Sequence, residues 1–193
     1  MNHRKTAFVF LLLGSLCAIL AFSTTSWMEL SHNGLKIHIG LWRMCSTNCS
    51  DLNGIVLRWY GFVQATACIG LVGTIVVSSL LGLCHYVERF QKNIAILRFT
   101  AVTCIITWLI EISGYVVFVL SWIRRSSDAM FNEDLIYMGL PAIKTDRADI
   151  SYSFFIAVFG AQFTVLAGII LFQMMDVSKQ GEPLYTEKSV DAT

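Results

Sequence analysis

Four long apolar stretches dominate the pattern of hydrophobic and polar positions along this chain. A helix needs about 20 residues to cross a hydrocarbon layer about 30 Å thick. The stretches are long enough for this, and they lie at 6–26, 61–83, 97–122 and 150–175. They do not alternate as barrel strands do, and a segment in lipid must satisfy its own backbone groups. The pattern therefore predicts an all-α membrane protein built on a bundle of four transmembrane helices.

The first stretch also has the outline of a secretory signal peptide. Arg4 and Lys5 precede it, and Ala21-Phe22-Ser23 resembles a small-residue cleavage site. Its apolar core of about 17 residues is nevertheless long for a signal peptide. We expect this segment to stay attached as the first span.

Positively charged residues near the ends of the stretches predict their orientation, because Lys and Arg in short loops remain cytosolic. Two basic residues precede the first stretch, and three lie in or beside the loop 84–96. These five residues are Arg4, Lys5, Arg89, Lys92 and Arg98. Arg124 and Arg125, after the third stretch, go against the rule. The majority predicts that the N-terminus and the loop 84–96 are cytosolic.

An even number of spans places both ends of the chain on the same side. The tail 176–193 is then cytosolic, and the loops 27–60 and 123–149 are extracellular. We treat residues 1–193 as a single domain and expect a multi-pass protein of the plasma membrane.

The loop 27–60 has a pattern of its own. Apolar and polar residues alternate in 28–30 and again in 35–39, on either side of Asn33-Gly34. Asn-Gly is the preferred pair for a tight hairpin because both positions favour positive φ. We therefore expect a small extracellular antiparallel β-sheet, to which Ile55-Val56-Leu57 is a candidate further strand.

The composition excludes several classes of function. Of the 193 residues 55% are hydrophobic, more than in a typical soluble domain, and the formal net charge is +1. That charge offers no basic surplus for nucleic acid. No nucleophile, base and orienting group converge in one loop, and no metal or phosphate-binding motif is present. We expect no enzyme activity, no cofactor and no small-molecule substrate, and we expect membrane lipid to surround the bundle.

A set of residues in the first loop and at the start of the second stretch resembles the signature of a known family. Trp27 is followed by Gly40-Leu41-Trp42, then by Cys45 and Cys49, and Gln64-Ala65-Thr66 opens the second stretch. This arrangement resembles the claudin superfamily, whose signature is W, GLW, C, C in the first extracellular loop of a four-span protein. The resemblance covers nearly the whole chain. It implies a claudin-like fold, in which a β-sheet stands on a four-helix bundle.

Physical chemistry gives these signature residues structural roles. The rings of Trp27 and Trp42 suit a boundary between apolar and polar surroundings, where they can tie the sheet to the bundle. Gly40 permits the close approach of another backbone segment or a bulge.

The two cysteines of the loop lie on the oxidising side of the predicted membrane. A Cys45–Cys49 disulfide can persist there and would staple adjacent strands or close a tight loop. The alternative is a metal-binding pair completed by His32 or His38, although no full set of zinc ligands is spaced for it. Only three residues separate the cysteines, fewer than is usual in claudins.

Two residues are candidates for modification. Asn48-Cys49-Ser50 is formally a glycosylation sequon in an outer loop. Cys84, at the cytosolic end of the second stretch, is a candidate for palmitoylation, which favours juxtamembrane cysteines. An unmodified thiol is the alternative for Cys84.

One acidic residue lies well inside a span. Glu111 is about midway along the third stretch, and ionisable groups within the membrane are costly and mark functional or packing sites. Gln162 lies at a similar depth in the antiparallel fourth stretch. We expect the protonated carboxyl group of Glu111 and the amide of Gln162 to form an interhelical polar pair.

The resemblance implies three alternative functions. The first is a tight-junction protein that binds like molecules in the same and the opposing membrane, with adhesion, barrier or ion-selectivity roles. Charged candidates for ion selectivity are Glu29, Lys36, Asp51 and Arg58. The second is an auxiliary subunit of an ion channel or receptor, like the calcium-channel gamma branch. The third is a membrane-organising role like that of the epithelial membrane proteins.

Overall fold

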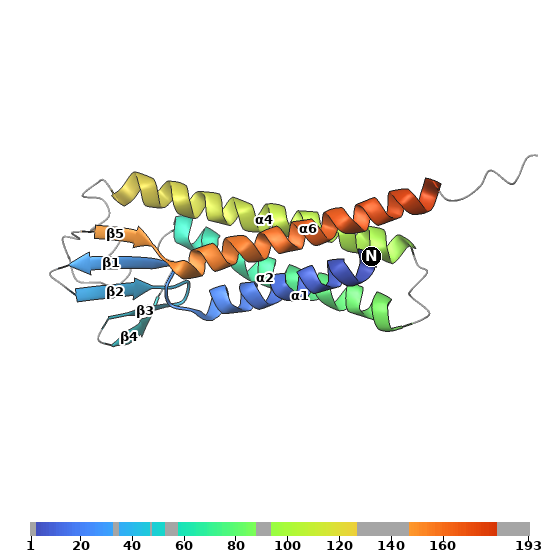
Figure 1. Ribbon diagram of the computed structural model, residues 1–193. Coiled ribbons are helices and arrows are strands. Elements are labelled where there is room, and N and C mark those ends of the chain that lie inside the picture. The colour runs from blue at the N-terminus through green and yellow to red at the C-terminus, as the bar shows by residue number, and fades with distance from the viewer. Residues whose placement is uncertain are drawn as a thin grey trace, which may run out of the picture.

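The computed structural model describes residues 3–32, 35–46, 48–52, 58–87, 94–126 and 147–180. In this part of the chain four long helices lie side by side, and a small sheet stands at one end of their bundle (Figure 1). The helices are α1 (His3–Ser23), α2 (Arg58–Tyr86), α4 (Ile94–Ser126) and α6 (Tyr152–Gln180). All four are long and apolar enough to cross a membrane, which confirms the prediction of four long apolar helices.

The helices extend past several of the predicted boundaries, because backbone hydrogen bonding continues where the apolar run stops. The clearest case is α4, whose 33 residues span about 50 Å at 1.5 Å per residue. This exceeds the thickness of the hydrocarbon layer. The C-terminal end of α4 consequently lies beside the sheet (Figure 1). In contrast, α1 ends at Ser23, three residues before the predicted end of its span.

Five antiparallel strands form one sheet in the order β4-β3-β2-β1-β5. They are β1 (Met28–His32), β2 (Leu35–Ile39), β3 (Arg43–Cys45), β4 (Cys49–Asp51) and β5 (Arg147–Ile150). The pairing of β1 with β2 confirms the predicted hairpin, and His32 is opposite Leu35 at its tip. The turn residues Asn33-Gly34 and the candidate strand Ile55-Val56-Leu57 lie outside the described residues.

The fifth strand was not predicted. It comes from the second loop, far along the chain, and pairs with β1 over Met28 to Ser31. Both loops at this end of the bundle therefore contribute to one sheet. The pairing also requires the two loops to lie on the same side of the membrane.

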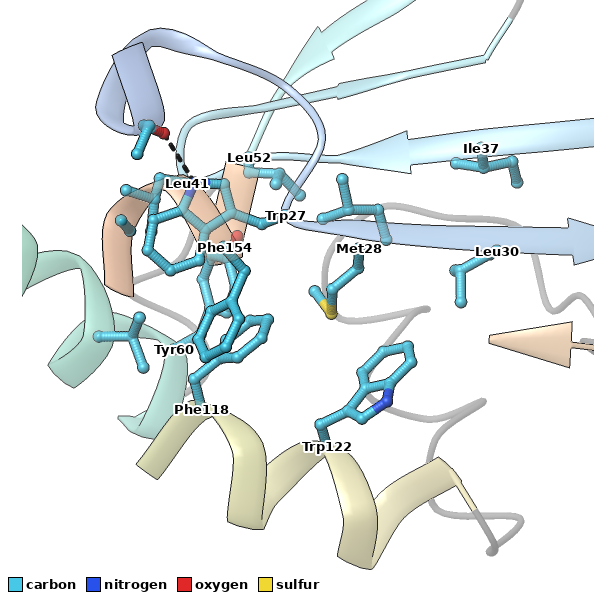
Figure 2. Packing of buried hydrophobic residues seen from close by; sticks show 14 residues of the cluster. Trp27, Met28, Leu30, Ile37, Leu41, Leu52, Tyr60, Phe118, Trp122 and Phe154 are labelled. Atoms are coloured by element: carbon cyan, nitrogen blue, oxygen red, sulfur yellow. Dashed lines mark hydrogen bonds between the residues drawn. The ribbon is translucent and has the colours of Figure 1, made fainter. Parts of the chain in front are cut away.

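The sheet has one buried and one open face, as a strand's alternation of side chains dictates. Met28 and Leu30 of β1, with their β2 partners Ile39 and Ile37, are all buried. Glu29 and its neighbours on the same face are at least partly exposed. The buried face is covered by the protruding end of α4, and Figure 2 shows Met28 pointing toward Trp122 of that helix.

Two apolar clusters form the core. The first joins the sheet to the adjacent ends of the helices and includes Trp27, Leu41, Tyr60, Phe118 and Phe154 (Figure 2). The second fills the opposite end of the bundle. Within the bundle, α6 packs against α1 and α4, and α2 packs against the same two helices.

Candidate interaction surface and the joint that holds it

Trp27 lies at the centre of the joint between sheet and bundle. Its side chain is 1% exposed, and its ring packs against the rings of Tyr115, Phe118 and Phe154 from α4 and α6. The indole Nε1 donates a hydrogen bond to the carbonyl of Ala21, 2.7 Å away, at the end of α1 (Figure 2). The predicted role of Trp27 as a tie between sheet and bundle is thus confirmed. Its place is the protein core, however, and not the boundary with lipid.

The segment Gly40-Leu41 is bound to α2 through its backbone. The Tyr60 hydroxyl donates to the Gly40 carbonyl, and Gln64 Nε2 donates to the Leu41 carbonyl over 2.5 Å. Tyr60 and Gln64 are four residues apart, so they lie on the same face of α2. Their i, i+4 spacing at the start of a span was visible in the sequence, but no periodicity indicates which carbonyls they bind.

Gly40 allows the backbone of another segment to approach closely, as predicted. A Cβ atom at this position would lie 2.6 Å from the Thr24 carbonyl oxygen and 2.6 Å from Thr25 Cα. Any side chain here would push the sheet away from the end of α1. Trp42, two residues on, is 36% exposed, and its ring lies 5.2 Å from that of Phe22.

Cys45 and Cys49 form a disulfide with an S–S distance of 2.01 Å. They are also directly opposite each other in the pairing of β3 with β4. Sulfurs bonded to each other are not available as metal ligands. Among the described residues no group of three His, Cys, Asp or Glu could hold a metal ion. The disulfide interpretation is therefore confirmed over the metal-binding one.

The open face of the sheet carries charged side chains in pairs of opposite sign. Lys36 Nζ lies 2.7 Å from Glu29 Oε1, and Arg43 Nε donates to Asp51 Oδ1 at 3.2 Å. His38 Nδ1 is 4.0 Å from the other Glu29 oxygen. Three of the four candidate selectivity residues thus have an oppositely charged neighbour. The fourth, Arg58, is exposed at the start of α2.

Glu111 faces α2, which differs from the prediction that Gln162 is its partner. Thr74 of α2 donates to Glu111 Oε1 over 3.5 Å, and the carboxyl group fits against the bare backbone of Gly70. Gln162 is exposed on the outer side of α6. Similar depth on two antiparallel helices does not determine which way each side chain points.

Glu111 lines a cavity of about 20 Å³ together with Trp27 and Leu41. Tyr115 also lines this cavity and donates to the Ala157 carbonyl of α6 at 3.3 Å. Glu111 Oε2 is buried without a hydrogen-bond partner among the described residues. The contact of Glu111 with Gly70 and Thr74 of α2 therefore leaves one carboxyl oxygen atom without a hydrogen bond.

The two candidate modification sites differ in accessibility. Asn48 is exposed at the tip of the β3–β4 hairpin, so its glycosylation stays a prediction. Cys84 is 0% exposed and belongs to the second apolar cluster. A buried thiol cannot receive an acyl chain without displacement of its helix, and the structure therefore favours the unmodified thiol.

No protein-family model matches the chain, and no curated protein matches it. The four apolar helices, the small antiparallel sheet and the Cys45–Cys49 disulfide are compatible with a claudin-like architecture. They define the class as a four-helix protein suited to a membrane, with a disulfide-closed sheet at one end.

Proposed function

We propose that this protein is a claudin-like component of cell–cell contacts, whose sheet binds like molecules in the same and the opposing membrane. The observation that carries the proposal is the fixed position of the sheet. Trp27, Gly40 and Leu41 bind it to all four helices, so its open face cannot turn freely relative to the membrane. A rigid, polar, outward-directed face is what recognition between membranes requires, because little ordering entropy is lost on contact.

The paired charges determine what kind of contact this face can make. A pore that selects ions is lined by charges of one sign. Here Glu29 neighbours Lys36 and Asp51 neighbours Arg43, so the signs alternate across the face. Alternating charges favour complementary binding to another protein surface, in which they fix register and partner choice. The proposal is therefore adhesion and barrier formation first, with ion selectivity as a secondary consequence.

The test uses cells that lack junction strands and express the tagged protein. We expect the protein to gather where two expressing cells meet and not where an expressing cell meets a non-expressing one. Transepithelial conductance should fall in a confluent layer. Absence of both effects, together with co-purification of a channel or receptor, would contradict the proposal and favour the auxiliary-subunit alternative.

Charge variants test whether the open face makes the contact. Lys36→Glu places two acids side by side, whereas the swap Glu29→Lys with Lys36→Glu keeps the local ion pair and exchanges its positions. We expect both to reduce enrichment at contacts, because both present the wrong charge to the partner. Lys36→Arg is the matched control and should leave enrichment unchanged. Full activity of the swap variant would show that only the local pair matters.

A further inference from the structure

Among the described residues, the outer surface of the bundle carries a polar side chain, Gln162, that lipid cannot satisfy. Hydroxyl groups exposed on the helices bond to their own backbone: Ser79 to Ile75, Thr103 to Phe99 and Ser113 to Ile110. The amide of Gln162 is exposed as well, yet it has no hydrogen-bond partner among the described residues. An amide in an apolar environment without such a partner is strongly unfavourable.

The depth of Gln162 leaves it no access to water. It lies near the middle of the candidate span Tyr152–Met175, 10 residues after its start and 13 before its end. Gln173, exposed on the same helix, is only two residues from the end of that span and can reach the headgroup region. Gln162 therefore requires a partner within the membrane.

The surroundings of Gln162 form a face that another helix can pack against. Phe155, Phe159, Leu166 and Ile169 flank it at alternating spacings of three and four residues, and all are exposed. The opposite side of α6 is already packed, since Gly160 lies against α1 and Gly168 against α4. The outer stripe has the spacing of a knobs-into-holes seam with one polar residue at its centre, an arrangement that fixes register in paired helices.

We propose that this stripe of α6 is a dimer interface, and that its occupant is the same stripe of a second copy of the chain. Two copies inserted alike cross the membrane in the same direction, so a two-fold axis along the membrane normal makes their α6 helices parallel. Identical residues then meet at identical depth. A primary amide is its own complement, with a donor and an acceptor, so Gln162 of each copy satisfies the other with two hydrogen bonds.

A second copy fits this face better than a helix of different chemistry. The stripe contains no charged residue, so it places no demand for an opposite charge on its partner. Interhelical hydrogen bonds between neutral side chains contribute to association within membranes. The inference goes beyond the proposed function, because the contacts proposed there are made by the sheet, whereas this contact is made by α6 and uses none of the sheet residues.

Cross-linking in membranes tests the interface directly. We expect Gln162→Cys to give a cross-linked dimer with an oxidant or a short bismaleimide. The control is Leu109→Cys, which is exposed at a similar depth on α4 and should give only the baseline of the parent chain, with its own free cysteines. Equal cross-linking at both positions would overturn the proposal.

Dimerisation measured by fluorescence transfer between labelled copies in vesicles tests the role of the amide. Gln162→Leu should weaken dimerisation about 3- to 30-fold, the range that one to two interhelical hydrogen bonds support. Gln162→Asn, which keeps the amide, should retain most of the affinity. Gln173→Leu removes an amide near the end of the span and should have no effect. Both residues, Gln162 and Gln173, lie on the outer surface, so the thermal midpoint in detergent reports that each of the three variants is folded.

Two results would contradict the inference. If the wild-type protein is monomeric at every protein-to-lipid ratio, it has no such interface. A different membrane protein whose co-purification is lost in Gln162→Leu, while the wild type remains monomeric, would assign the stripe to a foreign helix.

Discussion

At the scale of single residues, the joint between sheet and bundle depends on backbone carbonyls that accept side-chain hydrogen bonds. Gly40 and Leu41 lie between β2 and β3, where the chain turns toward the helices. Their carbonyl oxygens bind Tyr60 and Gln64, and Tyr60 is 0% exposed. A buried acceptor that loses its donor costs more than the hydrogen bond itself contributes, because water cannot replace the donor.

Tyr60→Phe tests this joint by removal of one hydroxyl group. We expect the free energy of unfolding to fall by about 1–3 kcal/mol, because the Gly40 carbonyl stays buried without its donor. Thermal unfolding in detergent measures the change. Tyr86→Phe, which removes a hydroxyl from a side chain that is 76% exposed, is the matched control and should have no effect. Equal midpoints for the two variants would show that the Gly40 contact contributes nothing.

The disulfide acts on a short segment. A loop of five residues restricts the unfolded chain by about 2 kcal/mol in the chain-entropy account. We expect the double variant Cys45→Ser with Cys49→Ser to lower stability by this amount and to increase proteolysis of β3 and β4, while the helices remain intact. Peptide mapping of the non-reduced protein checks the bond, and alkylatable thiols at both positions would disprove it.

At the scale of elements, α2 and α4 interlock through glycines that face polar side chains. Glu111 lies against Gly70, Thr107 against Gly73, and Thr66 against Gly114. The residue numbers rise on one helix as they fall on the other, as antiparallel packing requires. Each glycine leaves room for the facing side chain, which a larger residue at the glycine position would exclude. This polar seam specifies one register between the two helices, as small and polar residues do in membrane interfaces generally.

Gly70→Ala tests the seam. The added methyl group would lie 2.6 Å from Glu111 Oε1, so the helices must separate or the carboxyl group must move. We expect a loss of about 1–3 kcal/mol, the usual cost of overpacking. The control is Gly82→Ala on the same helix, where the nearest atom is a Phe8 ring carbon at 3.4 Å. That variant should be neutral or slightly stabilising, because alanine favours the helix.

We expect the Glu111 side chain to make the folded protein less stable than an apolar side chain at this position would. Its Oε2 atom is buried without a partner, and the Thr74 hydroxyl also donates to the Gly70 carbonyl at 2.8 Å. Replacement of Glu111 by leucine therefore leaves no donor unpaired and removes one unsatisfied oxygen. We expect Glu111→Leu to raise the thermal midpoint by about 2–4 °C, as a gain of about 1 kcal/mol would do. A fall would show that Oε2 is satisfied by a group such as an enclosed water molecule.

The elements that the sequence predicted are those with local signals. Four apolar runs predicted four helices, and Asn33-Gly34 between alternating residues predicted the β1–β2 hairpin. The strand β5 escaped prediction because it has four residues, two of them charged, and its only support is pairing with a segment more than 100 residues away. For the same reason the direction of Glu111 was not predictable. Periodicity identifies the faces of a helix but not which neighbour each face contacts.

At the scale of the whole molecule, the sheet constrains the topology more strongly than charge alone. β1 precedes α2 and β5 precedes α6, and their pairing requires both loops at the same end of the bundle. The N-terminal end of α1, the C-terminal end of α2 and the N-terminal end of α4 lie at the other end (Figure 1). With four spans arranged in this way, only one property of the topology remains to be determined, which is the side of the membrane on which the sheet lies.

Positive charge predicts that choice. Arg4, Lys5 and Arg98 lie at the end of the bundle opposite the sheet, and basic residues near span ends stay cytosolic. The sheet, with its disulfide, is then on the oxidising outer side. We expect tags at both termini to resist protease added to intact cells and to be digested once the membrane is permeabilised. A tag inserted at Asn48, which is exposed, should be digested in intact cells.

The same experiment decides between a retained first span and a cleaved signal peptide. α1 packs against both α2 and α6, and Gly14 approaches the Gly160 carbonyl closely. Cleavage after Ser23 would remove this helix from the bundle and expose buried residues of two others. The N-terminal tag should therefore be present on the mature protein at full length. Loss of that tag from the surface pool, or digestion of the C-terminal tag from outside, would contradict the four-span topology, because either result leaves an odd number of spans or the opposite orientation.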